Sequence, residues 1–223
     1  VFCITALTVS ATRAKLLAGQ LKRIHPDSTI IVGGIHASLL PEEFVDVAGH
    51  VVVGEAEEII VGLVEGAYTE KIVKGTRVAD LGSLPLLNYG LLEGRERMTT
   101  IPVMTSRGCP FDCSFCTVTA IFGRKFRMLS PERVVAEVEN GLRYFGTRDV
   151  FFYDDNFTAN RKRVMRICDL IIEKGLAFNW YAQVRTDLAK DPELVRKMVR
   201  AGCRWTYIGF ESIDDEVLKA YDK

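Results

Sequence analysis

Three cysteines stand close together in the sequence at the spacing CxxxCxxC: Cys109, Cys113 and Cys116. Three thiolates in so short a segment can wrap a soft metal centre, and a cuboidal iron–sulfur cluster has four irons to ligate. Three protein ligands would leave one iron open to another molecule. The spacing therefore predicts a four-iron, four-sulfur (4Fe-4S) cluster with one free coordination position.

Zinc and disulfide bonds are the alternatives for these cysteines. A structural zinc site normally takes a fourth Cys or His close by, whereas the next cysteine is Cys168 and the nearest histidine is His50. An odd set of cysteines cannot pair within itself, and the composition gives no sign of secretion. We therefore favour the cluster. The remaining cysteines are expected to be buried as small hydrophobic side chains: Cys3, Cys168 and Cys203.

The bulk composition is that of an ordinary globular protein. The chain has 223 residues, of which 48% are hydrophobic and 26% charged, with 29 basic and 29 acidic side chains. A net charge of zero does not favour nucleic acid as a partner. No apolar run approaches a membrane span, and six cysteines without a disulfide framework suit a reducing cytoplasm. The chain opens on Val1 inside an apolar strand, which indicates an internal piece of a longer protein.

Short β-rich runs alternate with helical stretches, which predicts α/β units around parallel strands. In the first part, strands are expected over 1–8, 28–32 and 50–53, and helices over 12–24, 41–48 and 58–65. Scattered Gly, Pro and charged residues predict a linker over 67–99, with a short hairpin near 69–73. We thus expect a first domain over 1–66 and a second over 100–223.

The second part reads as four strand–helix units. Strands are expected over 100–105, 149–153, 178–184 and 204–210, and helices over 130–145, 161–174, 192–201 and 214–221. In parallel α/β barrels the loops at the carboxyl ends of the strands build the active site. Polar groups follow each of these strands: the three cysteines, Asp154 with Asp155, Gln183 with Arg185, and Glu211.

Two of these groups have an ordinary structural alternative. Adjacent acids such as Asp154 and Asp155 repel unless a cation or donor faces them, and a bound ammonium group would serve; the alternative is a solvated turn in which Asn156 or Thr158 caps the next helix. Side-chain alternation predicts that Gln183 and Arg185 share the face of Tyr181, inside the barrel. There they could bind a ribose or carboxylate, or simply pair with a nearby acid.

The segment Cys109-Pro-Phe-Asp-Cys113-Ser-Phe-Cys116 resembles the signature of the radical S-adenosylmethionine (SAM) superfamily, including the aromatic Phe115 before the last cysteine. The resemblance implies a partial (β/α)6 barrel in which the amino and carboxylate groups of SAM chelate the open iron. It also implies reductive cleavage of SAM to a 5′-deoxyadenosyl radical. By the same resemblance the SAM contacts would come from Asp154, Asp155, Asn156, Gln183, Arg185 and Glu211, although many relatives carry Gly-Gly-Glu where this chain has Asp154-Asp155-Asn156.

Two segments of the first part, residues 33–38 and 51–57, resemble the cobalamin-binding domain found ahead of many radical SAM barrels. The resemblance implies the C-terminal part of a doubly wound, Rossmann-like sheet whose strand ends meet the corrin. Candidate contacts are Gly33, Gly34, His36, Gly54 and Glu55; the glycines could equally form tight turns, and His36 could complete one. Neither dinucleotide nor phosphate-loop glycine motifs occur, which argues against NAD and ATP.

Together the resemblances imply a cobalamin-dependent radical SAM enzyme that methylates an unactivated carbon of a small or lipid-like molecule. Its cofactors would be a 4Fe-4S cluster, SAM and cobalamin, and an external flavodoxin- or ferredoxin-type protein would supply electrons. Alternatives are a radical SAM enzyme that cyclises, rearranges or methylthiolates its substrate, and a non-catalytic cluster or cobalamin sensor.

Overall fold

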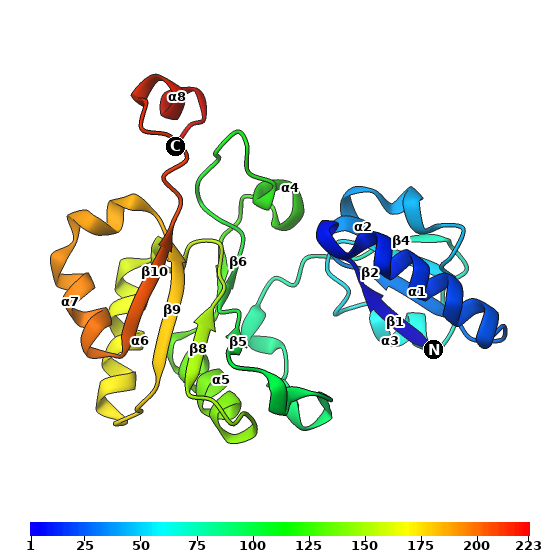
Figure 1. Ribbon diagram of the computed structural model, residues 1–223, viewed down its shortest axis with the longest axis horizontal. Coiled ribbons are helices and arrows are strands. Elements are labelled where there is room, and N and C mark those ends of the chain that lie inside the picture. The colour runs from blue at the N-terminus through cyan, green and yellow to red at the C-terminus, as the bar shows by residue number, and fades with distance from the viewer. The chain divides into compact units, whose positions relative to one another are not determined.

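The computed structural model describes residues 1–223, which divide into two compact units (Figure 1). The first unit comprises residues 1–79 and the second residues 80–223. Each is an α/β structure built on its own parallel sheet, as the alternation of strand and helix patterns predicts.

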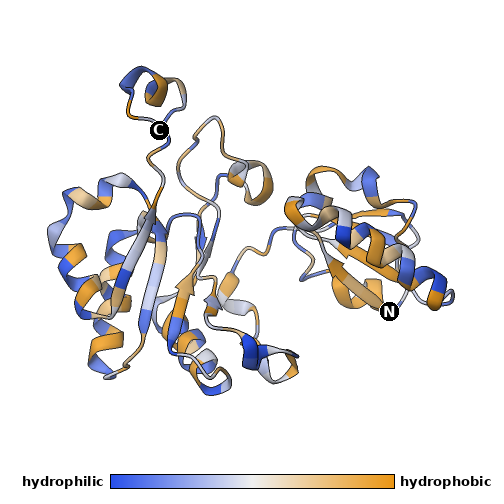
Figure 2. Ribbon diagram, viewed as in Figure 1, coloured by the Kyte–Doolittle hydropathy of each residue, from blue (hydrophilic) through white to orange (hydrophobic).

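The first unit contains a four-stranded parallel sheet in the order β1-β2-β3-β4, formed by Phe2–Thr5, Ile30–Gly33, His50–Val53 and Ile72–Lys74. Alternate residues of β2 point to opposite faces, and each face has its own core. Ile30 and Val32 pack with helix α1 (Ala11–Ile24), whereas Ile31 packs with helix α3 (Ile60–Val64). Helices therefore cover both faces, which confirms the doubly wound architecture; Figure 2 shows this hydrophobic centre.

Two expectations for the first unit are wrong in detail. The hairpin expected near 69–73 is instead the single strand β4, which extends the sheet in parallel to β3. The helix expected over 41–48 is only a 3-10 turn, Pro41–Phe44, and it follows a short helix α2 (Ile35–Leu39) that was not expected. Phe44 is fully buried in the same cluster as residues of α1, and the N–H groups of Val47 and Ala48 both donate to its carbonyl, so the segment continues as turns where the pattern predicts a helix.

The second unit contains a parallel sheet in the order β10-β9-β8-β5. Its strands run in chain order across the sheet, each followed by a helix, as expected for successive units of a barrel. The strands are Ile101–Val103, Asp149–Phe152, Asn179–Val184 and Cys203–Ile208 for β5, β8, β9 and β10; the helices are Pro131–Tyr144, Arg161–Glu173, Pro192–Arg200 and Asp215–Ala220 for α5 to α8.

Helix starts in the second unit follow from local chemistry. Ser130 accepts a hydrogen bond from the N–H of Arg133 ahead of Pro131, and Asp191 accepts one from Leu194 ahead of Pro192. Asn160 caps α6 by accepting from the N–H of Arg163. The structural alternative for Asn156 and Thr158, that one of them caps this helix, is therefore wrong, because Asn160 is the cap.

Strand β9 alternates as expected. Trp180, Ala182 and Val184 are buried under the helices, and the indole N–H of Trp180 donates to the carbonyl of Ala201. Gln183 lies on the opposite face and reaches solvent. The sheet therefore has one face packed against α5, α6 and α7 and one face available to other groups.

The structure around the cysteine segment was not predicted from the sequence. Ser106–Arg107 (β6) pairs antiparallel with Arg127–Met128 (β7), which closes the base of a long excursion that holds the three cysteines and the short helix α4 (Val118–Phe122). The excursion leaves the sheet after β5 and returns to α5.

The stretch 67–99, expected to be a linker, is divided between the units. Residues 67–79 include β4 and belong to the first unit. In the second unit, Arg133 of α5 donates to the carbonyls of Gly82 and Leu84, and the ring of Tyr89 packs edge-on against Phe145 with 5.0 Å between centroids.

The expected burial is confirmed for Cys168 and Cys203 but is wrong for Cys3, which lies exposed on β1. That strand is at the edge of its sheet, and Cys3 points to its less covered side. No helix combines the length and the apolar composition needed to cross a bilayer.

Candidate active site

The three loop cysteines are free thiols, each partly buried. Gly108 lets the chain turn into the cysteine segment with φ of +84°, and a Cβ there would lie 3.1 Å from the carbonyl oxygens of both Gly123 and Lys125. The N–H of Cys116 donates to the carbonyl of Cys113 at 2.9 Å, which closes a turn between these two cysteines. A glycine and a turn thus set the path of the cysteine segment.

Asp155 and Arg185 lie beside the cysteines. The N–H groups of Gly108 and of Asp155 itself hydrogen-bond the Asp155 carboxylate, whose pKa is raised by partial burial and by the charge of Asp154. A guanidinium N–H of Arg185 points to the Cys113 sulfur at 3.5 Å, and the same guanidinium lies 4.0 Å from the centroid of the Phe111 ring.

The charges of Asp155 and Arg185 both act on the pKa of the Cys109 thiol. Its pKa is raised by burial above all, and then by the negative charges of Asp155 and Cys116, whereas a backbone hydrogen bond from Phe111 and the charge of Arg185 lower it. The strand ends of β5, β8 and β9 therefore bring together thiols, one acid and one cation, as the sequence predicts.

Asp154 and Asn156 are turned away from this open group. Asp154 is 0% exposed, and both of its carboxylate oxygens accept hydrogen bonds from Thr105 or Ser106. Asn156 is also buried, and its side-chain oxygen accepts from the hydroxyl of Thr158 at 3.2 Å. Gln183 occupies an intermediate position, since its amide donates to the carbonyl of Asp154 at 3.3 Å while the residue reaches solvent.

Phe115 and Glu211 meet the C-terminal residues instead. The Phe115 ring packs against that of Tyr221 with 5.3 Å between centroids, and Glu211 pairs with Lys223 at 3.2 Å. Glu211 adopts a positive φ of 59°, which is uncommon for a residue with a side chain. These two candidates therefore lie with α8 rather than with Asp155 and Arg185.

The donor set fits an iron–sulfur cluster. No group of three His, Cys, Asp or Glu side chains converges as one metal ion would require. A four-iron cluster takes its cysteines at separate corners, and its thiolate ligands favour a nearby cation such as Arg185. The three thiols could hold the cluster, and Asp155 could accept a hydrogen bond from an ammonium group bound beside it.

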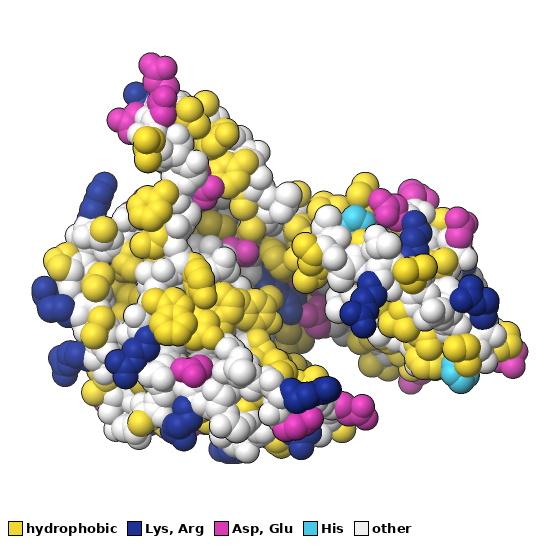
Figure 3. Space-filling model, in the orientation of Figure 1, with side chains coloured by type: hydrophobic (Ala, Val, Ile, Leu, Met, Phe, Trp, Pro, Cys, Tyr) yellow, Lys and Arg dark blue, Asp and Glu magenta, His cyan; other side chains and the backbone are white.

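An aromatic face, formed by Phe151, Tyr181, Trp205 and Tyr207, continues from this site along the open side of the sheet (Figure 3). Tyr181 stacks on Trp205 at 4.4 Å and on Phe151 at 5.2 Å between ring centroids. Trp205 is 49% and Tyr207 51% exposed. Tyr181, Gln183 and Arg185 alternate on one face of β9, so this strand links the aromatic face to the cysteine loop.

Sequence reasoning missed the aromatic face and two polar residues, Thr105 and Arg163, that contact Asp154 or the ends of the cysteine loop. The aromatic residues carry a signal, since Phe151 and Tyr181 occupy alternate positions in strands whose other face is buried. Arg163 carries none, because a basic residue near a helix start usually lies in solvent.

In the first unit, the candidate cobalamin residues lie at the carboxyl edge of the sheet. Gly34 has φ of +100°, and a Cβ there would lie 2.8 Å from the backbone N and O of Ala6, so a close approach between two strand ends requires this glycine. Gly54 also has a positive φ, whereas Gly33 has room for a Cβ in ordinary contact with Val52.

His36 and Glu55 are buried at the same edge. The Nδ1 of His36 lies 3.2 Å from the Thr8 hydroxyl, and its Nε2 lies 3.5 Å from a carboxylate oxygen of Glu43. Glu55 accepts a hydrogen bond from the N–H of Val78 at 3.0 Å. Around these groups the edge is apolar and open: Leu7, Val9, Leu39 and Leu40 are exposed, Val9 to 95%.

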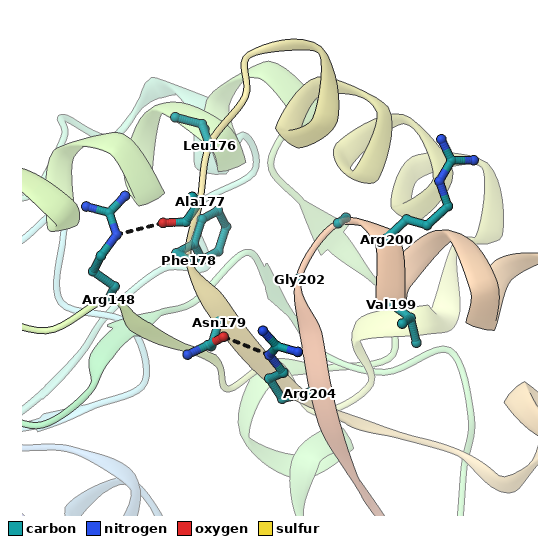
Figure 4. A pocket seen from close by; sticks show the side chains of 10 residues that line it. Arg148, Leu176, Ala177, Phe178, Asn179, Val199, Arg200, Gly202 and Arg204 are labelled. Atoms are coloured by element: carbon teal, nitrogen blue, oxygen red, sulfur yellow. Dashed lines mark hydrogen bonds between the residues drawn. The ribbon is translucent and has the colours of Figure 1, made fainter.

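The hollow drawn in Figure 4, of about 570 Å³, lies at the other end of the second sheet. Its arginines include Arg148 and Arg204, which donate to the carbonyl of Ala177 and the side chain of Asn179. These residues precede or begin β8, β9 and β10, so the hollow is at the amino edge of the sheet. Active sites of parallel α/β sheets form at the opposite edge.

Comparisons with known proteins identify a family for each part of the chain. The model of the radical SAM superfamily matches residues 103–223, and that of the B12 binding domain matches residues 1–64. The chain is 29% identical to bacteriochlorophyllide d C-8(2)-methyltransferase of Chlorobaculum tepidum, over 99% of this chain and 51% of that protein. It is 28% identical to an anaerobic magnesium-protoporphyrin IX monomethyl ester cyclase of Cereibacter sphaeroides, over 98% of this chain and 41% of that protein.

Two solved structures share the fold. The cobalamin-dependent radical SAM enzyme OxsB, with aqua-cobalamin and SAM bound, aligns with a TM-score of 0.78 at 18% identity, over 100% of this chain and 37% of that one. The radical SAM methyltransferase TsrM from Kitasatospora setae aligns with a TM-score of 0.77 at 18% identity, over 98% of this chain and 50% of that one. The chain spans about half the length of the curated relatives it matches.

Proposed function

This chain belongs to the radical SAM superfamily, with a B12-binding domain ahead of its radical SAM domain, and from that premise we propose that it is part of a cobalamin-dependent enzyme that methylates an unactivated carbon. The cofactors of this class are a 4Fe-4S cluster, SAM and cobalamin. The observation that supports the proposal most directly is the meeting of three free thiols with Asp155 and Arg185 at one sheet edge.

When bound, the cluster supplies the electron that cleaves SAM, and cobalamin supplies the methyl group. Cys109, Cys113 and Cys116 hold the cluster through their sulfurs. Asp155 would accept a hydrogen bond from the amino group of SAM, since it reaches solvent beside the cysteines whereas Asp154 is buried. Arg185 holds positive charge against the cluster sulfurs and orients the loop through Phe111.

The other candidates take supporting places around SAM. Gln183 offers an amide on the same face of β9 as Arg185. Asn156 shapes the turn after β8 from its buried position, and Phe115 and Glu211 border the site on the side of α8. The domain assignment follows the same reasoning: the cobalamin domain corresponds to the first unit, residues 1–79, and the barrel portion to the second, residues 80–223, so the stretch 67–99 expected as a linker is divided between them.

The carboxyl edge of the first sheet suits the broad, flat corrin. Gly33, Gly34 and Gly54 bring backbone to the surface there, while His36 and Glu55 are used inside the fold. The exposed apolar side chains at this edge, including Leu7 and Val9, offer contact area without hydrogen bonds. Cobalamin would thus be held mostly by shape and apolar contact, and His36 would support the edge rather than ligate cobalt.

The aromatic face supports a substrate that is largely apolar and contains rings. Exposed Trp205 and Tyr207 can stack on a planar ring system or pack against a polycyclic lipid, each burying a large area. Names of relatives agree with this class, since they act on bacteriochlorophyllide d, magnesium-protoporphyrin IX monomethyl ester and hopanoids. An external flavodoxin- or ferredoxin-type protein would deliver electrons in a reducing cytoplasm.

A cyclase is the second candidate, because the magnesium-protoporphyrin cyclase matches nearly the whole chain. Mass spectrometry of the product separates the two, since methylation adds one CH₂ unit to the substrate mass and cyclisation does not.

The test is anaerobic incubation of the full-length protein with cluster, cobalamin, SAM and a low-potential reductant. We expect 5′-deoxyadenosine to form, and Cys113→Ala to abolish both its formation and the brown absorbance of the cluster. Cys3→Ala is the matched control, because Cys3 is an exposed cysteine outside the loop. Deoxyadenosine formation by Cys113→Ala at the wild-type rate would contradict the proposal.

A further inference from the structure

Arg163 of α6 joins the two ends of the cysteine excursion. Its Nε donates to the carbonyl of Leu129 at 2.8 Å, and one Nη donates to the carbonyl and hydroxyl oxygens of Thr105 at 2.9 and 2.7 Å. Thr105 precedes β6 and Leu129 follows β7, and the N–H of Leu129 also donates to the carbonyl of Thr105 at 2.9 Å. One buried guanidinium therefore fixes where the excursion starts and where it ends.

Asp154 binds the same end from the sheet side. One carboxylate oxygen accepts from the backbone N–H groups of Thr105 and Ser106, each at 2.6 Å. The other accepts from the hydroxyl of Thr105 at 2.5 Å. With three short hydrogen bonds and no exposed surface, the carboxylate of Asp154 has no room for a bound ligand.

The hydroxyl of Thr105 connects the two charged residues, since it accepts from Arg163 and donates to Asp154. Burial raises the pKa of Asp154 and lowers that of Arg163, and the charge of each residue opposes the shift of the other. Buried charges are costly unless they are paired and hydrogen-bonded, so each of these two groups needs the other.

Asp154 and Asp155 point to opposite sides because successive residues of an extended chain alternate. Asp154 lies on the side of the helices, with Phe152, and is linked to Arg163 there through the hydroxyl of Thr105. Asp155 lies on the other side. It reaches solvent there, and its negative charge raises the pKa of the Cys109 thiol. The two acids therefore cannot exchange roles without a change in the backbone.

We infer that Asp154, Thr105 and Arg163 are positioning residues that set the cysteine loop for its cluster, and that Asp155 alone is the acid of this pair that contacts SAM. The inference rests on the proposed function, because it assumes that the loop holds a cluster. A cluster needs its three sulfurs at fixed positions, while the excursion contains only a two-residue strand at each end and the five-residue helix α4. Anchoring at its ends supplies the order that the loop itself lacks.

The test compares Asp154→Asn with Asp155→Asn in the full-length protein, purified anaerobically. Removing a supporting partner of a metal site typically costs about 10- to 100-fold in metal affinity, so we expect Asp154→Asn to lower iron and acid-labile sulfide per chain and to broaden the electron paramagnetic resonance (EPR) signal of the residual clusters. Asp155→Asn should keep the full cluster content but lose the shift of that signal when SAM is added. The reverse pattern would overturn the inference, as would equal cluster content with an intact SAM response in both variants.

A second pair of variants covers the case in which Asp154→Asn does not fold. Thr105→Val keeps the side-chain shape but removes the hydroxyl between Arg163 and Asp154, whereas Thr105→Ser keeps that hydroxyl. We expect loss of cluster content in Thr105→Val, with a lower melting temperature because two buried charged groups lose a hydrogen bond, and recovery of both in Thr105→Ser. Equal cluster content in the two variants would overturn the inference.

Arg163→Gln should also lower cluster content. Its matched control is Arg166→Gln in the same helix, which should not, because Arg166 makes only surface ion pairs with Glu132 and Glu173. A wild-type protein that takes up neither iron nor sulfide would instead contradict the proposed function, so the two failures are distinguishable.

Discussion

The carboxyl edges of the two sheets use their polar residues in different ways. In the first unit, His36 and Glu55 are buried and bonded to neighbours in the same unit, and Ser38 bridges two loops by donating to the carbonyl of Gly34 and accepting from the N–H of Gly54. In the second unit, Asp155 and Arg185 retain contact with solvent beside three free thiols.

This difference indicates two ways of holding a cofactor. An edge whose polar side chains are buried among neighbours of the same unit offers mainly backbone and apolar surface, and binding there depends on shape. An edge with unused thiolates and charges offers ligands and specific hydrogen bonds. Changes at the first edge should therefore act through local stability, and changes at the second through the chemistry of the bound groups.

Gly34→Ala should have the largest effect on stability. The new Cβ would lie 2.6 Å from the Thr5 hydroxyl oxygen and 2.8 Å from the Ala6 backbone, at a φ of +100°. Overlap and backbone strain together should cost about 3 kcal/mol or more. We expect the urea midpoint of the first unit and its cobalamin binding to fall while cluster content is kept.

Gly66→Ala is the control for this variant, because Gly66 also has a positive φ but open space around it. It should cost only the strain of the backbone, about 1–2 kcal/mol. Equal urea midpoints for the two alanine variants would show that the close approach at Gly34 is unimportant.

Gly108→Ala should act on the cluster rather than on the sheet. Its Cβ would press on the carbonyls of Gly123 and Lys125 at 3.1 Å, at a φ of +84°, and displace the chain just before Cys109. Iron and sulfide content should fall severalfold, with a smaller change in melting temperature. Gly175→Ala, with a positive φ but no neighbour within 4 Å, should keep its cluster; loss in both would point to general destabilisation.

Arg185→Gln should change the cluster's potential while its content stays near that of the wild type. A positive charge 3.5 Å from the Cys113 sulfur stabilises the reduced cluster, which carries one more negative charge. Removing it should lower the reduction potential by an amount on the order of tens of millivolts, measured by potentiometric titration with EPR detection. Arg185→Lys should recover part of the shift. A reduction potential unchanged in Arg185→Gln would show that the charge of Arg185 does not act on the cluster.

The smallest effect concerns the cysteines outside the loop. Burial raises the pKa of Cys203 to about 12, and burial with the charge of Cys203 raises that of Cys168 to about 12. Since the thiolate is the reactive form, cluster-free folded protein should be alkylated by iodoacetamide at neutral pH at Cys3, Cys113 and Cys116, more slowly at Cys109, whose pKa burial also raises, and not at Cys168 or Cys203. Peptide mass mapping checks this, and labelling of Cys168 at the rate of Cys3 would contradict it.

The sequence predicted what depends on local pattern. The four strand–helix units, the face alternation of β9 and the position of the cysteines at a strand end all follow from periodicity and from helix-start residues such as Ser130 and Pro131. Recognition of the family rested on the cysteine spacing and on a few short segments. These features are encoded within a few residues of each other.

What the sequence did not reveal depends on long-range contacts. The different roles of Asp154 and Asp155 could not be predicted, because they depend on Arg163 and Thr105, which approach Asp154 only after folding. The short turn at Pro41–Phe44 and the parallel strand β4 were also set by packing, against α1 and β3 respectively.

The most direct test of the central claim is EPR of the full-length protein, purified without oxygen and reduced with dithionite, before and after addition of SAM. The account predicts the signal of a reduced 4Fe-4S cluster and a clear shift when SAM occupies the open iron. Protein that contains zinc without inorganic sulfide, or a cluster signal unchanged by SAM, would contradict it.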